Sequence, residues 1–293
     1  MLMGRLLKPS EGQIVYHYCS AETLRAILES KKIRFTDINM LNDAQEGCWG
    51  YGVFEEAATR LLNRTGIPDT IPSLPKSFFD SVDEVLSNIQ LIAHPFVACF
   101  SADADDLGQW RAYADDGRGF AIGFRSENLK QLPVSVLSVA YDLEQQIKEM
   151  MAALVAIFMR HGTVDHKEHL LDCALTATYM CAFKHSAFKA EKEVRCLHIL
   201  NVKREGDDYK FVDPGGQNDN GHAFEPVPVG FQVRGNHLCA YLDLPFWSQE
   251  GEHPIAEIVL GPKNESHYGN VFLYLGAVGY KGVGLRSSQI PYR

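Results

Sequence analysis

The order of hydrophobic and polar positions predicts many short strands in this chain. Apolar runs of about four to eight residues, bounded by glycine, proline or charged turns, are typical of buried strands. Such runs fall at residues 14–18, 33–37, 96–101, 117–124, 136–142, 193–200, 231–235, 239–246, 255–261 and 282–288. Because the strands gather in clusters with helices between the clusters, the pattern favours an α+β fold with a mixed or antiparallel sheet.

Helical periodicity separates these clusters. Ser20 is a suitable N-cap, and Leu24, Ile27 and Leu28 follow it at the i, i+3, i+4 spacing of a helix with one buried face. Longer helical patterns cover about 49–93, broken by three prolines between 65 and 76, and about 143–185. We therefore predict a single domain over residues 1–293 with helical insertions in those two ranges.

Composition and charge narrow the class of protein. The 293 residues are 46% hydrophobic and carry a formal net charge of -9. A negative surface repels phosphate backbones, so general nucleic-acid binding is not expected. Seven cysteines without a C-x-x-C pair are typical of a reducing compartment. The longest apolar run, residues 150–159, is about half of what a bilayer span requires. The sequence thus predicts a cytoplasmic protein without a membrane span.

Two segments place polar and aromatic side chains beside predicted strands. In "HYCS", residues 17–20, His17 ends a strand just before a helix; it is either a core histidine bonded to backbone or a pocket residue. In the second segment, Ser101, Trp110, Arg111 and Tyr113 surround a short predicted helix. Trp110 and Tyr113 stand at helical spacing, which suits either the core or a platform for a ligand.

A third segment, "EKEVR" at 191–195, alternates charged residues along a predicted strand. Alternation would place Glu191, Glu193 and Arg195 on one face of that strand. Two carboxylates on one face repel each other unless a cation or a polar ligand separates them. The segment is therefore either part of a site or an edge strand with a solvated charged face, in which Arg195 pairs with Glu193.

Taken together, these motifs resemble a known bacterial family. "HYCS", "LNDAQEG", "CFS…WRAYADDGRGFAIGF", "K…EKEVR" and "IVLGPK…SSQIPYR" resemble, in order, the domain of unknown function 2971, over residues 16–293. Where that family commonly has "FNDPFE", this chain has Leu41 to Glu46 without the proline and the aromatics.

That family is similar, more distantly, to ADP-ribosyltransferase-like folds. The similarity implies a split sheet in which a histidine ends the first strand, an aromatic follows an "F-S" strand and a glutamate stands on a later strand. It also implies NAD as the substrate and no metal. The residues that the resemblance assigns to catalysis are Glu193, Glu191 and Tyr113, and those assigned to binding NAD are His17, Tyr18, Ser101, Trp110 and Arg111.

Two other functions stay open on the sequence. The first is a non-catalytic module of the same fold that binds a nucleotide or a protein partner. The second is a zinc site at His166, His169 and Cys173, although polar residues on an exposed helix face explain that pattern more simply.

Overall fold

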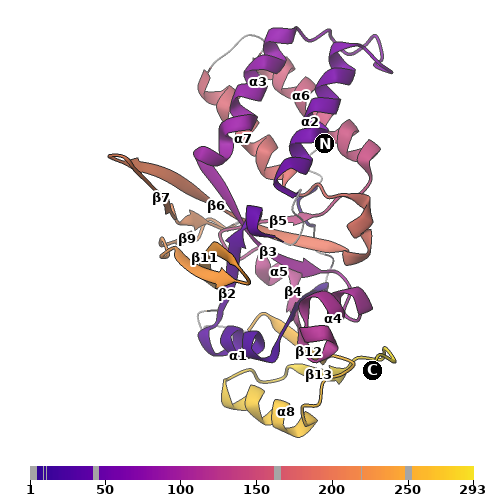
Figure 1. Cartoon of the computed structure of the whole chain (residues 1–293), viewed down its shortest axis with the longest axis vertical. Coiled ribbons are helices and arrows are strands. Elements are labelled where there is room, and N and C mark those ends of the chain that lie inside the picture. The colour runs from indigo at the N-terminus through magenta and orange to yellow at the C-terminus, as the bar shows by residue number, and fades with distance from the viewer. Residues whose placement is uncertain are drawn as a thin grey trace.

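The computed structural model describes residues 5–8, 10, 12–41, 46–161, 166–218, 220–247 and 253–293 (Figure 1). Residues 42–45, on which most of the "LNDAQEG" motif falls, lie outside that range. The strands are β1 (Ile14–Cys19), β2 (Lys32–Asp37), β3 (Ala93–Ser101), β4 (Phe120–Arg125), β5 (Ser135–Ser138), β6 (Glu193–Glu205), β7 (Asp208–Val212), β8 (Gly216–Gln217), β9 (Ala223–Phe224), β10 (Gly230–Arg234), β11 (His237–Pro245), β12 (Ile255–Leu260) and β13 (Gly284–Ser287).

Helices lie between the strand clusters, as the periodicity predicted. The α-helices are α1 (Ala21–Ser30), α2 (Glu46–Leu62), α3 (Lys76–Asn88), α4 (Leu107–Tyr113), α5 (Ser126–Leu129), α6 (Leu143–His161), α7 (His166–Met180) and α8 (Tyr268–Ala277). The 3-10 helices are η2 (Ile38–Met40), η3 (Ile89–Leu91), η4 (Asp115–Gly117) and η5 (Ser186–Glu191). None of the helices in the described ranges is long and apolar enough to cross a membrane.

A large mixed sheet forms the centre of the molecule, which confirms the α+β class. Within the described residues its main path runs β10-β11-β2-β3-β1-β4-β12-β13, and β6 joins β3 and carries β5 and β7. Neighbouring strands pair antiparallel except β12 and β13, which are parallel. A hydrophobic core lies against this sheet, where α1 contributes Leu24, Ile27 and Leu28.

The first helix shows how local sequence directs the chain into the sheet. The hydroxyl of Ser20 accepts a hydrogen bond from the N–H of Thr23 at 3.2 Å and so caps α1, as predicted. Lys31, in the left-handed region with φ 57°, ends the helix and turns the chain into β2. The helix thus connects β1 to β2, two strands that both reach β3.

Helices α2, α3, α6 and α7 pack together at the end of the molecule drawn at the top of Figure 1. They come from the two predicted insertions, 49–93 and 143–185, and they share a hydrophobic core of their own. Its largest buried members include Phe54, Phe78, Phe79, Met150 and Phe183. The insertions therefore form a helical layer that packs separately from the core of the sheet.

Candidate functional site

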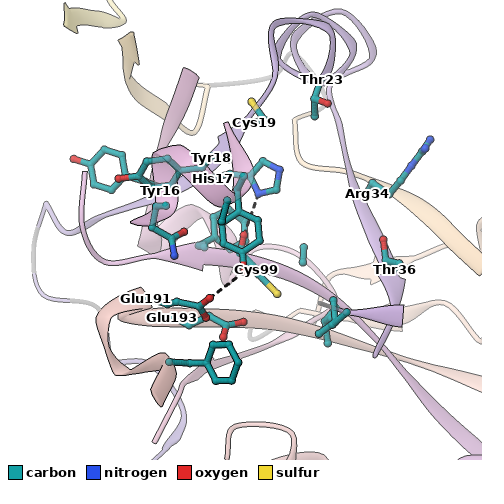
Figure 2. A pocket seen from close by; sticks show the side chains of 18 of the residues that line it. Tyr16, His17, Tyr18, Cys19, Thr23, Arg34, Thr36, Cys99, Glu191 and Glu193 are labelled. Carbon is teal, nitrogen blue, oxygen red and sulfur yellow. Dashed lines mark hydrogen bonds between the residues drawn. The ribbon is translucent and has the colours of Figure 1, made fainter. Parts of the chain in front are cut away.

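A pocket opens where the sheet splits. Strand β2 pairs with one edge of β3, where Thr36 of β2 lies opposite Val97. Strand β1 pairs with the same edge of β3 further along, where Tyr16 of β1 lies opposite Ser101. The edge of β3 between those contacts, residues 98–100, is left without a strand partner on that side. A cavity of about 340 Å³ lies there, lined by residues of β1, β2, β3, α1 and α4 and by the segment that precedes β6 (Figure 2). This volume suits a small organic ligand.

His17 lies at the split, where it both bonds to the backbone and lines the pocket, as the two alternatives for this residue predicted. Its Nδ1 lies 3.0 Å from the carbonyl oxygen of Cys99. A carbonyl oxygen only accepts, so Nδ1 donates that hydrogen bond. Burial lowers the pKa of His17, and the bond to Cys99 opposes this only in part. The ring is therefore neutral at neutral pH, and its Nε2 carries a lone pair that can accept a hydrogen bond.

The backbone of Cys99 adds a second polar group to the pocket. In an antiparallel strand the N–H and C=O of one residue point to the same edge. Because the carbonyl of Cys99 faces His17, its N–H faces the split as well. The uncovered edge of β3 thus offers a ligand a backbone donor beside the histidine acceptor.

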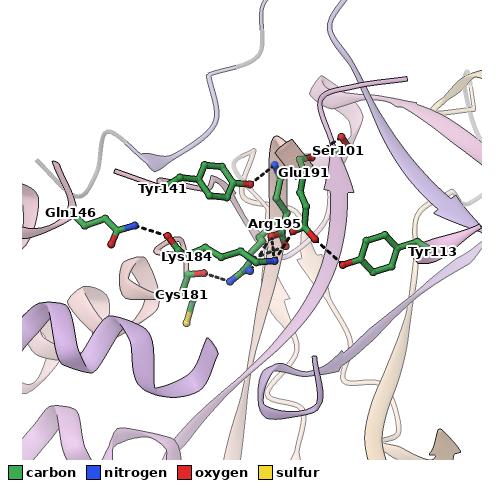
Figure 3. Close-up of polar contacts among 9 residues, drawn as sticks. Ser101, Tyr113, Tyr141, Gln146, Cys181, Lys184, Glu191 and Arg195 are labelled. Atoms are coloured by element: carbon green, nitrogen blue, oxygen red, sulfur yellow. Dashed lines mark hydrogen bonds and ion pairs between the residues drawn. The ribbon is translucent and has the colours of Figure 1, made fainter. Parts of the chain in front are cut away.

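Two carboxylates and a lysine form the opposite wall of the pocket (Figure 3). Lys184 Nζ lies 2.6 Å from Glu191 Oε2 and 2.9 Å from Glu193 Oε2. The expected cation between the carboxylates is therefore present. Burial lowers the pKa of Lys184, but the charges of Glu193 and Glu191 outweigh burial and raise that pKa overall. Lys184 is thus a permanent cation held in place by its two acidic partners.

Glu191 does not stand on the strand, so that part of the prediction is wrong. It ends η5, and β6 begins at Glu193. Lys192 between them adopts the left-handed region, with φ 45°, and breaks the alternation. Both carboxylates still meet because they bind the same ammonium group of Lys184. The left-handed turn, not strand alternation, brings them together.

Glu193 is the more deeply fixed of the two carboxylates. Arg195, which is 0% exposed, donates from Nε to Glu193 Oε1 at 2.7 Å and from Nη2 to Oε2 at 3.0 Å. Burial raises the pKa of Glu193, and Lys184 opposes that rise. Lys184 and Arg195 both contact the carboxylate, and each contact favours its charged form. The alternative of a solvated edge strand is wrong, since β6 pairs with β3 on one side and with β5 and β7 on the other.

Tyr113 connects α4 to this acidic wall. Its hydroxyl donates a hydrogen bond to Glu191 Oε1 at 2.9 Å, and the ring lines the pocket. Tyr113 holds one carboxylate oxygen of Glu191 and Lys184 holds the other. Each oxygen keeps a second lone-pair direction for a ligand. Glu191 is therefore both oriented and accessible, with 18% of its side chain exposed against 6% for Glu193.

Tyr18 lines the pocket through its ring, while its hydroxyl supports the neighbouring loop. That hydroxyl donates to the carbonyl of Asp103 at 2.9 Å and accepts from the N–H of Asp106 at 3.1 Å. Burial raises the pKa of Tyr18 well above its usual range. Asp106 is also the N-cap of α4, so Tyr18 positions the helix that carries Tyr113.

The structure brings five of the eight predicted site residues to the pocket, and three lie outside its lining. The lining residues are His17, Tyr18, Tyr113, Glu191 and Glu193. Trp110 is fully buried, packs edge-on against Tyr18 at 4.7 Å and donates from Nε1 to Asp105 at 2.7 Å. Its role is therefore core packing rather than direct contact with a ligand.

Ser101 and Arg111 are the other two predicted residues that do not line the pocket. The hydroxyl of Ser101 donates to the backbone carbonyl of Glu191 at 2.8 Å, which ties β3 to the end of η5. Arg111 is exposed, and its guanidinium lies 5.9 Å from the ring of Tyr292. Ser101 therefore positions a pocket residue, and Arg111 supports the C-terminal segment.

Sequence reasoning missed Lys184, Cys99 and Arg34 as pocket residues. Lys184 is the first residue of the motif "K…EKEVR", but its distance along the sequence from Glu191 and Glu193 does not predict that its ammonium group contacts them. The side-chain amide of Gln146 holds it there, by donating to the backbone carbonyl of Lys184 at 2.9 Å. Cys99 carried no signal, because its contribution is a backbone edge.

The structure describes two of the three side chains of the suggested zinc site, those of His169 and Cys173. Cys173 Sγ lies 3.7 Å from His169 Nε2, and Ser81 Oγ lies 3.5 Å from the same nitrogen. The side chain of His166 is outside the described part of the chain. Among the side chains that the structure describes, no group of three His, Cys, Asp or Glu residues could hold a metal ion.

The fold and the pocket define the class of this protein: an α+β protein with a pocket at a split in a mixed sheet. A family described as "Protein of unknown function (DUF2971)" matches residues 109–196. That range begins within α4, ends in β6 and contains Tyr113, Lys184, Glu191 and Glu193. The resemblance to this family is thus supported for the acidic wall of the pocket. No curated protein and no solved structure matches the chain.

Proposed function

We propose that this protein cleaves the nicotinamide–ribose bond of NAD, as an ADP-ribosyltransferase-like enzyme or as an NAD hydrolase. The observation that carries the proposal is that His17, Tyr113 and Glu191 face one pocket at the split of the sheet. They come from β1, α4 and η5, far apart in the sequence. A split sheet with these residue types is what the resemblance to ADP-ribosyltransferase-like folds implies.

The chemistry suits the acidic wall. When the bond between the ribose C1′ and the nicotinamide nitrogen breaks, its electron pair leaves with nicotinamide and positive charge develops on the sugar. A preorganised carboxylate stabilises that charge. Water or another acceptor then attacks C1′, and a carboxylate takes the proton that the acceptor loses. The neutral Nε2 of His17 accepts a hydrogen bond from a ribose hydroxyl, and the ring of Tyr113 offers a face for nicotinamide.

Within this proposal, Glu191 is the carboxylate that contacts the substrate. Glu193 is bound by Arg195 from behind and by Lys184 from the side, and it is one-third as exposed as Glu191. Its part is to hold Lys184, which in turn orients Glu191. The resemblance assigns both glutamates to catalysis, whereas in this proposal Glu191 contacts the substrate and Glu193 supports it from behind.

A binding module without catalysis is the second candidate function, and one observation favours it. Lys184 and Arg195 place two positive charges against the two carboxylates, so the acidic wall carries no net charge. A neutral network of this kind suits recognition of a polar ligand as well as it suits stabilisation of a cation. The two functions differ in turnover, which an assay separates directly.

The test is release of nicotinamide from NAD by the purified protein, with and without cell lysate to supply an acceptor. We expect Glu191→Gln to lower the rate about 100-fold or more, since it removes the charge but keeps the shape. Glu265→Gln, at an exposed glutamate, is the matched control and keeps the full rate. Absence of release from the unmodified protein, together with NAD binding by calorimetry, would favour the binding module. Absence of both release and binding would refute the enzyme and also a module that binds NAD.

A further inference from the structure

A second hollow adjoins the pocket, between α1 and the β10–β11 hairpin. It has a volume of about 510 Å³ and shares His17, Thr23, Arg34 and Arg234 with the pocket. Those four residues form the junction between the two hollows. In Figure 2, Thr23 and Arg34 lie on the side of the pocket away from Glu191. The two hollows therefore make one groove with an acidic wall at one end.

The junction contains a guanidinium group in a fixed position. Arg34 donates from Nε and Nη2 to the two carboxylate oxygens of Asp243, each at 2.8 Å, and from Nη1 to Gln232 at 2.7 Å. Its charge also lies over the ring of Tyr241, 3.7 Å from the centroid. A guanidinium has five N–H donors, so these three bonds leave two N–H groups for a ligand. Arg34 is thus preorganised as a donor to an anion.

Further cations gather on the same side of the groove. Arg234 ends β10 beside the hairpin turn and lines both hollows, and Lys32 begins β2 and lines the outer hollow. Glu22 is the one acidic side chain of the outer lining besides Asp243, which Arg34 already binds. The junction therefore favours negative charge, whereas the charges of Glu191 and Glu193 are balanced by those of Lys184 and Arg195.

The outer hollow beyond the junction has the lining of a ring-binding site. Ala26, Ile27 and Val233 give it apolar walls, and Ser30 and Gln232 add hydroxyl and amide groups. Flat heterocycles bind in hollows of this mixed character, where apolar walls cover the ring and a few polar groups bind its edge. An extended ligand could thus place one ring at each end of the groove and an anionic linker at the junction.

From this arrangement we infer that the groove binds a dinucleotide, with its diphosphate at Arg34 and Arg234 and its second nucleoside in the outer hollow. The inference rests on the proposed function for the assignment of the first ring to the acidic wall. It adds the positions of the diphosphate and of the second nucleoside of the substrate, which the proposed function leaves open. Both Arg34 and Arg234 act here as binding residues, not as catalytic ones.

The experiment measures ligand affinity by calorimetry for Arg234→Gln, with Arg204→Gln as the matched control. Both arginines are exposed, but Arg204 lies in β6, opposite Tyr209 of β7, and lines neither hollow. The probes are NAD, ADP-ribose and nicotinamide riboside, which has no phosphate. We expect Arg234→Gln to weaken NAD and ADP-ribose about tenfold or more, and to leave nicotinamide riboside unchanged. Raising the salt concentration should weaken the same two ligands.

The outcomes separate this inference from the proposed function. If ADP-ribose binds through Arg234 but no nicotinamide is released from NAD, the position of the diphosphate is supported and the proposed NAD-cleaving activity is refuted. If nicotinamide is released and Arg234→Gln leaves the KM for NAD unchanged, the proposed NAD-cleaving activity is supported and the position of the diphosphate at the junction is refuted. Equal weakening of all three probes, or no binding by any of them, also overturns the assignment of the diphosphate to the junction.

Discussion

Replacing Lys184 with methionine tests the cluster on which the acidic wall depends. Lys184 is 5% exposed, and its ammonium group is the contact that Glu191 and Glu193 share. Methionine keeps most of the length and the apolar stem but removes the charge. Two carboxyl groups then face each other without the ammonium group that they share, and Arg195 contacts that of Glu193. Removing one partner of a buried ion pair costs about 3–5 kcal/mol, and we expect a loss of unfolding free energy in that range.

The assay is urea denaturation followed by tryptophan fluorescence, repeated from pH 8 down to pH 5. In the variant, mutual repulsion raises the pKa of one carboxylate in the folded state above its unfolded value. A group with a raised folded pKa contributes stability at low pH that is lost as the pH rises through that pKa. The variant should therefore recover part of its deficit relative to the unmodified protein as the pH falls. Lys189→Met, at an exposed lysine in the same segment, should change stability by less than about 0.5 kcal/mol.

A loss below about 1 kcal/mol for Lys184→Met would refute the reasoning, because that is the value of an exposed ion pair. So would a deficit that is the same at pH 5 and pH 8, since repulsion between two carboxylates must depend on their protonation. A large deficit in Lys189→Met would show instead that the segment, and not the buried charge, is sensitive to substitution.

Two further predictions follow from the strands that carry the pocket. A methyl group on Gly119 would clash with the backbone carbonyl oxygen of Cys19, so Gly119→Ala should lower the free energy of unfolding, measured by urea denaturation, by about 3 kcal/mol or more. Gly52→Ala, in α2 with nothing within 4 Å, should raise it by about 1 kcal/mol, and equal effects would contradict the contact. His17 should titrate below pH 6.5 by NMR, because burial lowers its pKa. The neutral His17 therefore stabilises the folded protein at higher pH, and this stabilisation is lost as the pH falls through its lowered pKa. A pKa above 6.5 would contradict the neutral ring.

The fold was largely predictable because its signals are local. The cap at Ser20 and the apolar spacing of Leu24, Ile27 and Leu28 fix α1 before any tertiary contact is known. Clustering of the strands was enough to predict an α+β protein with a mixed sheet. Neighbour relations in the sheet were not predictable from periodicity alone. The apolar pattern of β6 marks a buried strand, but nothing in it names β3, β5 and β7 as its partners.

The site was predictable in its residue types but not in its geometry. Glu191 and Glu193 were singled out from an alternation that the structure breaks at Lys192, whose left-handed conformation carries no clear mark in the sequence. Trp110 and Tyr113 are aromatic residues three positions apart in one helix. Trp110 is nevertheless fully buried, whereas Tyr113 lines the pocket. Which face of a seven-residue helix meets the ligand depends on what packs against it. Local patterns do not contain that information.

The position of Lys184 has opposite consequences for stability and for the proposed chemistry. Its positive charge offsets the repulsion between the carboxyl groups of Glu191 and Glu193, so the two can lie against one ammonium group in the folded protein. The same charge lowers the negative potential that a developing cation on ribose would experience. Arg195 contacts Glu193, whereas Lys184 contacts both glutamates, so Lys184 is the cation that lies against Glu191. Catalysis therefore requires the substrate to lie closer to the carboxylate of Glu191 than to the ammonium of Lys184. Tyr113 favours that arrangement, because it holds Glu191 from the side opposite to the lysine contact.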